Sequence, residues 1–504
     1  MKDELPEGWD VVKLPEVCQL NPGKPDASRV TGDTQVTFVP MAAVDAELGQ
    51  ITKPILRAYT EVSKGFTAFQ ENDVIMAKIT PCMENGKAAI ARGLSNGIGF
   101  GSTEFHVLRH NRAILPEYLF YFIRQDSFRG SAEASMTGSV GQKRVPLDFL
   151  RDTVLPLPPT NEQLRIVARL EELLSRVDAA QARLATIPRI LKRFRQSVLA
   201  AACSGKLTAD WRKKNANRSA SSLLDKITKR RKELWAKQRK AKGLAARPTD
   251  YPEPATPSDE FDFEVPESWE TCSMDALTNV ITSGSRDWKR YYRDDGCGTF
   301  IMAQNIRPMR FDSSYRLAVA PPENDRDRAR SEVFKEDLLV TIVGANTGDS
   351  CRVPLELREH YVCQSVALMR PVLPSTSPFL EVFLNSTGHG LAQYKKWIYG
   401  EGRPHLSFDH LRETLVCLPP LAEQQEIVRR VEALFKTADA LEARYHTAKT
   451  YVDKLTQSIL AKAFRGELVP QDPNDEPASA LIEDIRQQSS GHRVNKRGKK
   501  VVGT

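Results

Sequence analysis

The segment Leu157–Val167 reads LPPTNEQLRIV, and a close copy, LPPLAEQQEIV, stands at Leu418–Val428, 261 residues further along the chain. The same offset relates residues 141–207 to residues 402–468 without a gap. A gapless match of this length indicates an internal duplication. The chain of 504 residues is therefore two copies of one unit, each consisting of a variable domain followed by a shared helical segment.

The duplication continues more weakly on both sides of the shared segment. Residues 222–227 resemble residues 480–485, and residues 5–9 resemble residues 265–269. Between these anchors the two copies diverge almost completely. A stretch rich in Pro, Asp and Glu, residues 248–264, is expected to be the linker between the copies.

Both shared segments carry apolar residues at spacings that alternate between three and four, as in the a/d seam of a coiled coil. The first seam consists of Ile166, Leu170, Leu173, Val177, Ala180, Leu184, Ile187, Leu191, Phe194 and Val198. The second consists of Ile427, Val431, Leu434, Ala438, Leu441, Tyr445, Ala448, Val452, Leu455 and Ile459. Two matching seams in one chain can pair with each other, so we expect an intramolecular coiled coil; a generic helical-bundle core is the alternative.

The ends of these helices are also marked in the sequence. Thr160 and Gln163 fit a capping box at the start of the first helix. Gly205 and Gly466 stand where a C-terminal cap is expected. Pro188 interrupts the first helix, and we expect it either to kink that helix or to restart it.

The variable domains show patterns of mixed α and β structure. Predicted strands are 36–41, 74–79 and 105–108 in the first domain and 299–303, 338–343 and 366–369 in the second. A closing helix is predicted over residues 116–129 and, in the second domain, over residues 378–397. Polar loops follow at matching places, namely 80–87 and 137–144 in the first domain and 344–349 and 400–405 in the second.

These loops and their flanks are rich in the side chains that read base edges in DNA. Arg and Lys suit guanine, and Asn and Gln suit adenine. The candidate DNA-binding residues are Lys78, Asn85, Lys87, Gln142, Lys143, Arg144, Gln304, Asn305, Arg307, Asn346, Thr347, Arg403 and His405. Each alone is as well explained as a solvated loop residue, but equivalent polar loops in two divergent copies favour a shared binding role.

Composition and motifs argue against several other classes of protein. With 41% hydrophobic and 27% charged residues the chain is expected to be globular and cytoplasmic, without a signal peptide or membrane helix. The eight cysteines form no CxxC pair, so we expect free thiols and no metal site. Residues 344–349 resemble a phosphate-binding loop only superficially, because the lysine is absent. No methyltransferase or hydrolase motif was found, which favours a binding protein over an enzyme.

The positive charge is concentrated in two segments. Residues 206–247 contain 15 Lys and Arg against three acids, and residues 486–504 contain six and no acid, within a net charge of +8. We expect these segments to assist binding to phosphates or to an acidic partner without reading sequence. A solvated linker and a disordered tail are the alternative.

The segments LPPLAEQQEIVRRVEALF from Leu418, TQSILAKAFRGEL from Thr456 and IPRILKRFRQSVL from Ile187 resemble the conserved regions of type I restriction–modification specificity subunits. The resemblance implies an α+β fold: two mixed α/β target-recognition domains separated by two long helices in an antiparallel intramolecular coiled coil, with a pseudo-two-fold internal repeat. It also implies a non-catalytic subunit that reads a bipartite double-stranded DNA target, one domain per half-site. Two methylation subunits and restriction subunits are the implied partners, and S-adenosylmethionine, ATP and Mg are expected on those partners.

The expected domains are the first recognition domain at 1–157, the first conserved helical region at 158–247, the linker at 248–264, the second recognition domain at 265–418, the second helical region at 419–486 and a basic disordered tail at 487–504. A coil from Ile166 to Val198 would be roughly 48 Å long, which bounds the separation of half-site centres at about 14 base pairs. A scaffold whose variable domains bind proteins is the alternative function, and an enzyme with an unrecognised site is a third.

Overall fold

The structure is a computed structural model that describes residues 5–24, 30–139, 141–357 and 359–498, with side chains up to residue 488. The chain divides into two compact units. Unit 1 combines Met1–Ala185 with His446–Thr504, and unit 2 is Thr186–Tyr445. Each unit therefore joins one recognition domain to parts of both shared helical segments, so the units do not coincide with the two sequence copies.

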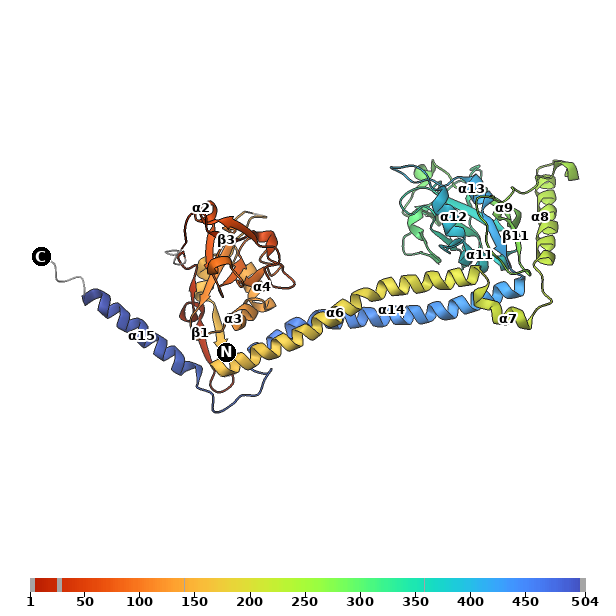
Figure 1. Ribbon diagram of the computed structural model, residues 1–504. Coiled ribbons are helices and arrows are strands. Elements are labelled where there is room, and N and C mark those ends of the chain that lie inside the picture. Colours follow the sequence, from red (N-terminus) through yellow and green to blue (C-terminus); the bar gives the residue numbers. More distant parts are fainter. Residues whose placement is uncertain (1–4, 25–29, 140, 358, 499–504) are drawn as a thin grey trace. The chain divides into compact units, whose positions relative to one another are not determined.

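The first recognition domain, in unit 1, contains two four-stranded sheets and one strand pair (Figure 1). One sheet has the order β4 (Ile55–Ala58), β3 (Gln35–Val39), β8 (Ile98–Gly101), β5 (Thr67–Gln70). The other has the order β2 (Cys18–Leu20), β9 (Phe105–His110), β6 (Val74–Ala77), β7 (Ala88–Ile90), and β1 (Asp10–Lys13) pairs with β10 (Val154–Leu157). The helices are α1 (Leu14–Val17), α2 (Tyr59–Val62), α3 (Pro116–Ile123), α4 (Asp126–Ala134) and α5 (Leu147–Asp152).

The second recognition domain, in unit 2, repeats this plan with one four-stranded sheet, one three-stranded sheet and two strand pairs. Its four-stranded sheet has the order β12 (Thr278–Ser283), β20 (Val366–Pro371), β17 (Leu338–Thr341), β18 (Ser350–Arg352). A three-stranded sheet has the order β16 (Ala318–Val319), β13 (Gly298–Ile301), β19 (His360–Val362), with pairs β14 (Ile306–Arg307)–β15 (Arg310–Phe311) and β11 (Glu270–Ser273)–β21 (Leu415–Leu418). The helices are α9 (Met274–Leu277), α10 (Arg328–Ser331), α11 (Ser377–Leu384), α12 (Gly390–Trp397) and α13 (Phe408–Glu413).

All six strands predicted from the sequence are present, as β3, β6, β9, β13, β17 and β20. The predicted closing helices are wrong in detail, because each is broken into two, α3 with α4 and α11 with α12. Both breaks fall at polar stretches, residues 124–127 and residues 385–390, which the prediction did not take into account. The backbone at Gln125 is extended instead of helical, which starts α4 on a new axis.

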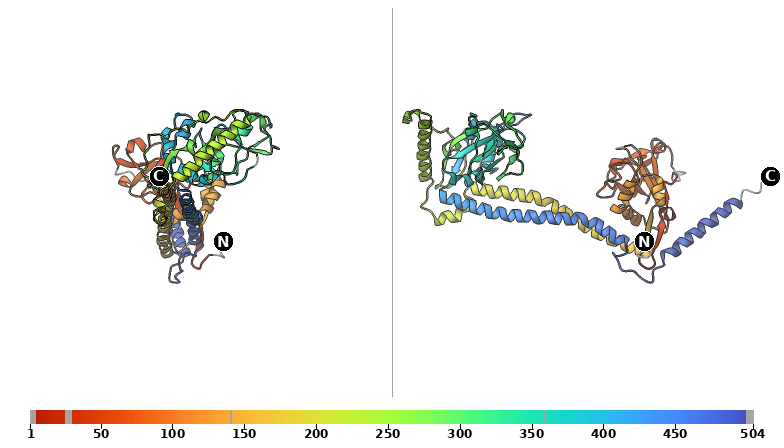
Figure 2. Two further views of the ribbon diagram at one scale, coloured as in Figure 1. Left: turned by 90° about the vertical axis from the view of Figure 1, so that its right-hand side faces the viewer. Right: turned by 180° about the vertical axis from the view of Figure 1, so that it is seen from behind.

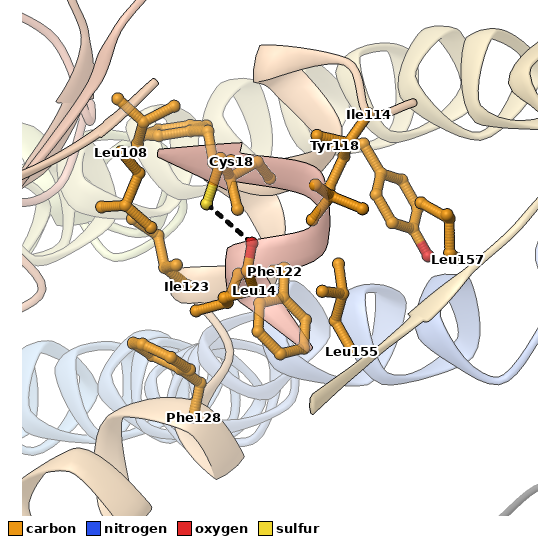
Figure 3. Packing of buried hydrophobic residues seen from close by; sticks show 14 of the residues in the cluster. Leu14, Cys18, Leu108, Ile114, Tyr118, Phe122, Ile123, Phe128, Leu155 and Leu157 are labelled. Atoms are coloured by element: carbon orange, nitrogen blue, oxygen red, sulfur yellow. Dashed lines mark hydrogen bonds between the residues drawn. The ribbon is translucent and has the colours of Figure 1, made fainter. Parts of the chain in front are cut away.

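The core of unit 1 lies between the β2-β9-β6-β7 sheet, α3 and the long helices. Figure 3 shows part of it, with side chains of α1, α3, α4 and β10 packed together. Cys18 belongs to this core, where its Sγ donates a hydrogen bond to the Leu14 carbonyl at 3.2 Å. Burial raises the pKa of Cys18 to about 12, so the thiol stays protonated as an inert core group.

The two shared segments form helices of 44 residues each, α6 (Thr160–Cys203) and α14 (Leu421–Phe464). Within each unit they run antiparallel (Figure 2): the start of α6 packs with the end of α14 in unit 1, and the end of α6 packs with the start of α14 in unit 2. Every predicted seam position except Phe194 and Leu441 is buried or half-buried. The intramolecular coiled coil is therefore confirmed, and the long helices do not form the generic helical-bundle core that was the alternative.

The structure corrects one of the expected helix features, excludes one of the two alternatives for Pro188 and confirms the C-terminal glycines. Helix α6 continues through Pro188 as one element, so Pro188 does not restart it. Gln163 does not cap the helix; its side chain bonds to the backbone of Leu115, Ala113 and Pro158 instead. Gly205 and Gly466 have φ of 73° and 75°, the left-handed conformation expected just beyond a helix end.

Three further helices extend the shared segments: α7 (Ala209–Lys214), α8 (Ser221–Ala241) and α15 (Ala478–Gly498). The part of the expected disordered tail from residue 487 to residue 498 is thus helical, and residues 499–504 lie outside the described residues. The expected linker is not free of the domain either. Phe261 and Phe263 pack against the core of unit 2, and the Phe261 ring lies 5.3 Å from that of Trp397.

Candidate DNA-recognition interface

Each recognition domain is fixed to the helices by a tryptophan and a buried glutamate. In unit 1 Trp9 Nε1 donates to Glu162 Oε2 at 3.0 Å, and in unit 2 Trp269 Nε1 donates to Glu423 Oε2 at 3.0 Å. Both glutamates stand in the first turn of a long helix. The repeated Trp and Glu were visible in the duplicated sequence, but their contact was not.

The other anchor of each domain comes from the opposite copy. Gly205, at the end of α6, lies against Pro266 of the second domain, and Gly466, at the end of α14, lies against Pro6 of the first. A Cβ added to Gly205 would stand 2.6 Å from Pro266 Cγ, so only glycine permits this approach. Each domain is thus held by the start of its own helix and the end of the other.

The breaks in the closing helices are occupied by matching glutamines of the coil. Gln457 Oε1 accepts from the Asp126 amide at 2.8 Å in unit 1, and Gln196 Oε1 accepts from the Thr387 amide at 3.2 Å in unit 2. Each glutamine satisfies an amide that the interrupted helix leaves without an intrahelical partner. The sequence carried a signal for this role, since both glutamines fall in the repeat, but the partner could not be read from it.

In unit 1 the two predicted polar loops, residues 80–87 and 137–144, lie side by side. The Thr80 amide donates to the Lys143 carbonyl at 3.0 Å, and the ends of the second loop close through a bridge between Thr137 and Arg144. The first loop follows β6 and the second follows α4. Segments more than 50 residues apart therefore form one polar surface.

Unit 2 repeats this arrangement with residues 344–349 and 400–405. The Gly344 amide donates to the Pro404 carbonyl at 3.0 Å, and His405 bridges to both Val343 and Tyr399. His405 occupies the place that Arg144 occupies in unit 1, as the offset of 261 requires. The same backbone framework thus carries different side chains in the two domains.

The candidate side chains of unit 1 gather on this surface. Asn85, Gln142, Lys143 and Arg144 are exposed, and Lys78 and Lys87 are half-buried. Lys87 Nζ donates to the Met41 carbonyl at 3.0 Å, which ties down one of its donors.

Arg144 is held in position by an acid that the sequence analysis did not single out. Its Nε and Nη2 donate to Glu104 at 2.9 and 2.8 Å, a bidentate pair. The Arg144 guanidinium lowers the pKa of Glu104, so the carboxylate is ionised at neutral pH. This contact and a hydrogen bond from Nη1 to the Gln142 carbonyl at 3.0 Å fix the plane of the guanidinium, while 44% of the Arg144 side chain stays exposed.

The candidates of unit 2 do not all reach a surface. Gln304, Asn346 and Arg403 are exposed, and Arg307, Thr347 and His405 are half-buried.

The structure corrects the prediction that Asn305 is a DNA-binding residue. Asn305 is 1% exposed, and its amide donates to the carbonyls of Asp312 and Tyr315 at 2.8 Å and accepts from the Met302 amide at 2.9 Å. It holds a turn and is not available to a base, because a sequence pattern cannot separate an exposed Asn from a buried one.

Part of the second surface is less cationic than that of unit 1. Asp349 lies in the first loop, and burial raises its pKa while Arg307 and Lys395 act in the opposite direction. The ring of Tyr399 stacks on that of His405 at 5.8 Å, and Tyr399 is 56% exposed. This surface therefore presents the rings of Tyr399 and His405 in the same loop as Arg403.

In the part of the chain that the structure describes, no three His, Cys, Asp or Glu side chains group as a metal site. The buried thiols are also inert, since burial raises the pKa of Cys272 and Cys417 to about 12. Among the described residues, no helix is both long and apolar enough to cross a membrane.

Comparison with known proteins identifies the class. The sequence profile of the type I restriction modification DNA specificity domain matches residues 6–189 and 366–448. The EcoBI specificity subunit from Escherichia coli is 34% identical over 388 residues, covering 73% of this chain and 72% of that protein. The EcoEI specificity subunit from Escherichia coli is 28% identical over 522 residues, covering 91% and 83%.

Solved structures agree on the fold. The HsdS subunit from Thermoanaerobacter tengcongensis superposes with a TM-score of 0.59 at 22% identity, covering 92% of this chain and 98% of that one. A chain from a study of assembly and conformational transition of the type I R-M system gives 0.64 at 22% identity, covering 92% and 99%. The chain belongs to the family of type I restriction–modification specificity subunits.

Proposed function

We propose that this chain reads a bipartite DNA target, with one recognition domain for each half-site, and performs no catalysis itself. The observation that carries the proposal is the repeated joining of two distant polar loops in each domain, 80–87 with 137–144 and 344–349 with 400–405. A shared framework with divergent side chains is what two readers of different half-sites require.

Within each surface we assign the reading role to exposed side chains with base-compatible geometry. Arg144 and Lys143 in the first domain, and Arg403 and Asn346 in the second, are the strongest candidates. The bidentate contact with Glu104 supports Arg144 in particular, since a fixed guanidinium discriminates bases better than a free one.

The chain is proposed to act in the cytoplasm inside a larger complex. Two methylation subunits would bring S-adenosylmethionine, and restriction subunits would bring ATP and Mg. The family membership supports this assembly, in which the chain would recognise the DNA sequence. Incubated alone with labelled S-adenosylmethionine and unmethylated DNA, it is expected to transfer no methyl group; robust transfer would contradict a non-catalytic role.

The test of half-site reading is a domain exchange. Residues 1–157 are replaced by the first domain of another family member, and the methylated motif is read by single-molecule sequencing of host DNA. One half of the motif should change while the other half stays. A change in both halves would show that the domains do not read independently.

A further inference from the structure

Helix α8 is fixed to the second recognition domain along one face. Leu223 and Ile227 are buried in the core of unit 2. Arg231 donates to Tyr251 Oη at 2.6 Å and to the Thr278 carbonyl at 3.1 Å, and it pairs with Asp275 at 3.3 Å. Figure 1 shows α8 running along one side of this domain. Helix α8 is thus packed on the second recognition domain from Leu223 to Arg231.

Another face of α8 carries an exposed stripe of cations, which we call the lysine stripe. Its members recur at helical spacing and are Lys226, Lys229, Arg230, Lys237 and Lys240. Arg230 pairs with Glu233 at 3.0 Å, whereas the four lysines make no ion pair with the described residues. From Lys226 to Lys240 the stripe is about 21 Å long at 1.5 Å per residue.

The composition of the stripe favours phosphates over a protein partner. No exposed residue of α8 is aromatic or a large aliphatic, whereas the centre of a protein–protein interface is apolar and depleted in lysine. Lysine is a compact, strongly hydrated point charge, which suits contacts with phosphate groups that need no fixed geometry.

A second observation comes from the other copy. Helix α15 is anchored to the first domain as α8 is to the second: the Ala478 amide donates to the Gly8 carbonyl at 3.0 Å, and the Ala220 amide donates to the Ser268 carbonyl at 2.9 Å. Arg486 pairs with Glu16 of the first domain as Arg231 pairs with Asp275 of the second. Beyond these anchors both sequences become rich in Lys and Arg. Two otherwise divergent copies thus keep a basic extension beside a recognition domain.

The stripe is separate from the polar loops of the same domain. Thr278, which Arg231 contacts, begins β12 and pairs with Pro371 at the end of β20. Strand β17 leads into loop 344–349, and its last residue pairs with Val366 at the start of β20. The anchor of α8 and this loop therefore lie at opposite ends of one sheet.

We propose that the lysine stripe of α8 is a sequence-independent contact with double-stranded DNA, which binds phosphates outside the half-site read by the second domain. This inference rests on the proposed function, because it needs a duplex bound to that domain. The stripe contributes affinity and salt dependence but no base preference.

The test removes the four unpaired lysines together, as Lys226→Gln, Lys229→Gln, Lys237→Gln and Lys240→Gln. The full-length chain, assembled with its methylation subunits, is titrated by fluorescence anisotropy with its target duplex at several salt concentrations. Each lost phosphate contact should reduce the log–log salt slope by about 0.9, up to about 3.6 for all four. The ratio of target to random-duplex affinity and the methylated motif should not change.

The matched control is Lys→Arg at the same four positions, which keeps the charge and should keep the slope. Circular dichroism checks that α8 is still folded. An unchanged slope in the Gln variant would overturn the inference. Loss of restriction-subunit binding at an unchanged slope would assign the stripe to a protein partner and also overturn it. If the unmodified complex shows no preference for its methylated motif, the proposed function itself fails, and that result is distinct from any change in slope.

Discussion

Glu423 and Glu162 occupy equivalent positions in the two units, but in the described part of the chain only Glu423 forms an ion pair with a cationic side chain. Glu423 is fully buried and accepts from Trp269, from Thr208 Oγ1 at 2.7 Å and from Arg212 Nη1 at 2.5 Å. Glu162 is equally buried but accepts from Trp9 and from Gln471 Nε2 at 3.1 Å, and it forms no direct ion pair with any residue that the structure describes. We therefore predict that Glu423→Gln destabilises unit 2 far more than Glu162→Gln destabilises unit 1.

The magnitude follows from the contacts. Breaking a buried ion pair from one side costs about 3–5 kcal/mol. The Arg212 side chain is 20% exposed, so water solvates part of the charge that the substitution leaves unpaired. The cost should therefore lie at the lower end of this range, about 3 kcal/mol. Burial raises the pKa of Glu162, which means that its charge is already disfavoured in the fold. A glutamine at position 162 has the same shape and can keep hydrogen bonds to Trp9 and Gln471. The Glu162→Gln substitution is therefore expected to cost only about 0–1 kcal/mol of stability.

The assay is hydrogen exchange of the full chain, followed by mass spectrometry of peptides that cover residues 265–275 and 6–14. A loss of 3 kcal/mol corresponds to an increase of about a hundredfold in the local opening equilibrium around Trp269. Arg212→Gln in the Glu423→Gln background should add little, because the pair is already broken. Equal effects of the two glutamate variants, or additive effects of Glu423→Gln and Arg212→Gln, would refute the reasoning.

The remaining predictions concern pH, base reading, the coil and the tail. The guanidiniums of Arg429 and Arg430 lower the pKa of Glu426 to about 2, and Arg430 lowers that of Asp210 to about 2. The ionised carboxylates of Glu426 and Asp210 therefore stabilise the fold fully above about pH 4.5, and this stabilisation is lost as the pH falls toward 2. The difference in the free energy of unfolding between the unmodified chain and Arg430→Gln, measured with urea, should vanish over the same pH range. Arg144→Ala or Arg403→Ala should cost ~1–3 kcal/mol in affinity and relax one base position if the arginine reads a base; equal weakening on all duplexes would assign it to phosphate. One extra heptad in each of α6 and α14 adds roughly 10 Å of helix and should widen the gap in the methylated motif by about three base pairs, while an unchanged gap in an active complex would rule out the coil as a ruler. Deletion of residues 487–504 should leave the methylated motif as it is, and a new motif after the deletion would contradict a helper role for the tail.

The sequence alone determined the elements that depend on local pattern. The a/d spacing located both long helices, because burial along a helix repeats with its turn. The gapless offset of 261 established the duplication, and with it the equivalence of Arg144 and His405. The polar loops were placed correctly because apolar strands bound them on one side.

Only the tertiary structure decided which segments hold one another. Antiparallel pairing brings the end of each long helix to the start of the other, so Gly205 meets Pro266 and Gly466 meets Pro6, contacts between copies that no local pattern encodes. Polar stretches at residues 124–127 and 385–390 mark the two helix breaks in the sequence, but the hydrogen bonds that Gln457 and Gln196 make there could not be read from it. Asn305 shows the same limit for a single side chain: an asparagine looks alike in sequence whether it faces solvent or is buried with its hydrogen bonds satisfied, and only packing around it separates the two.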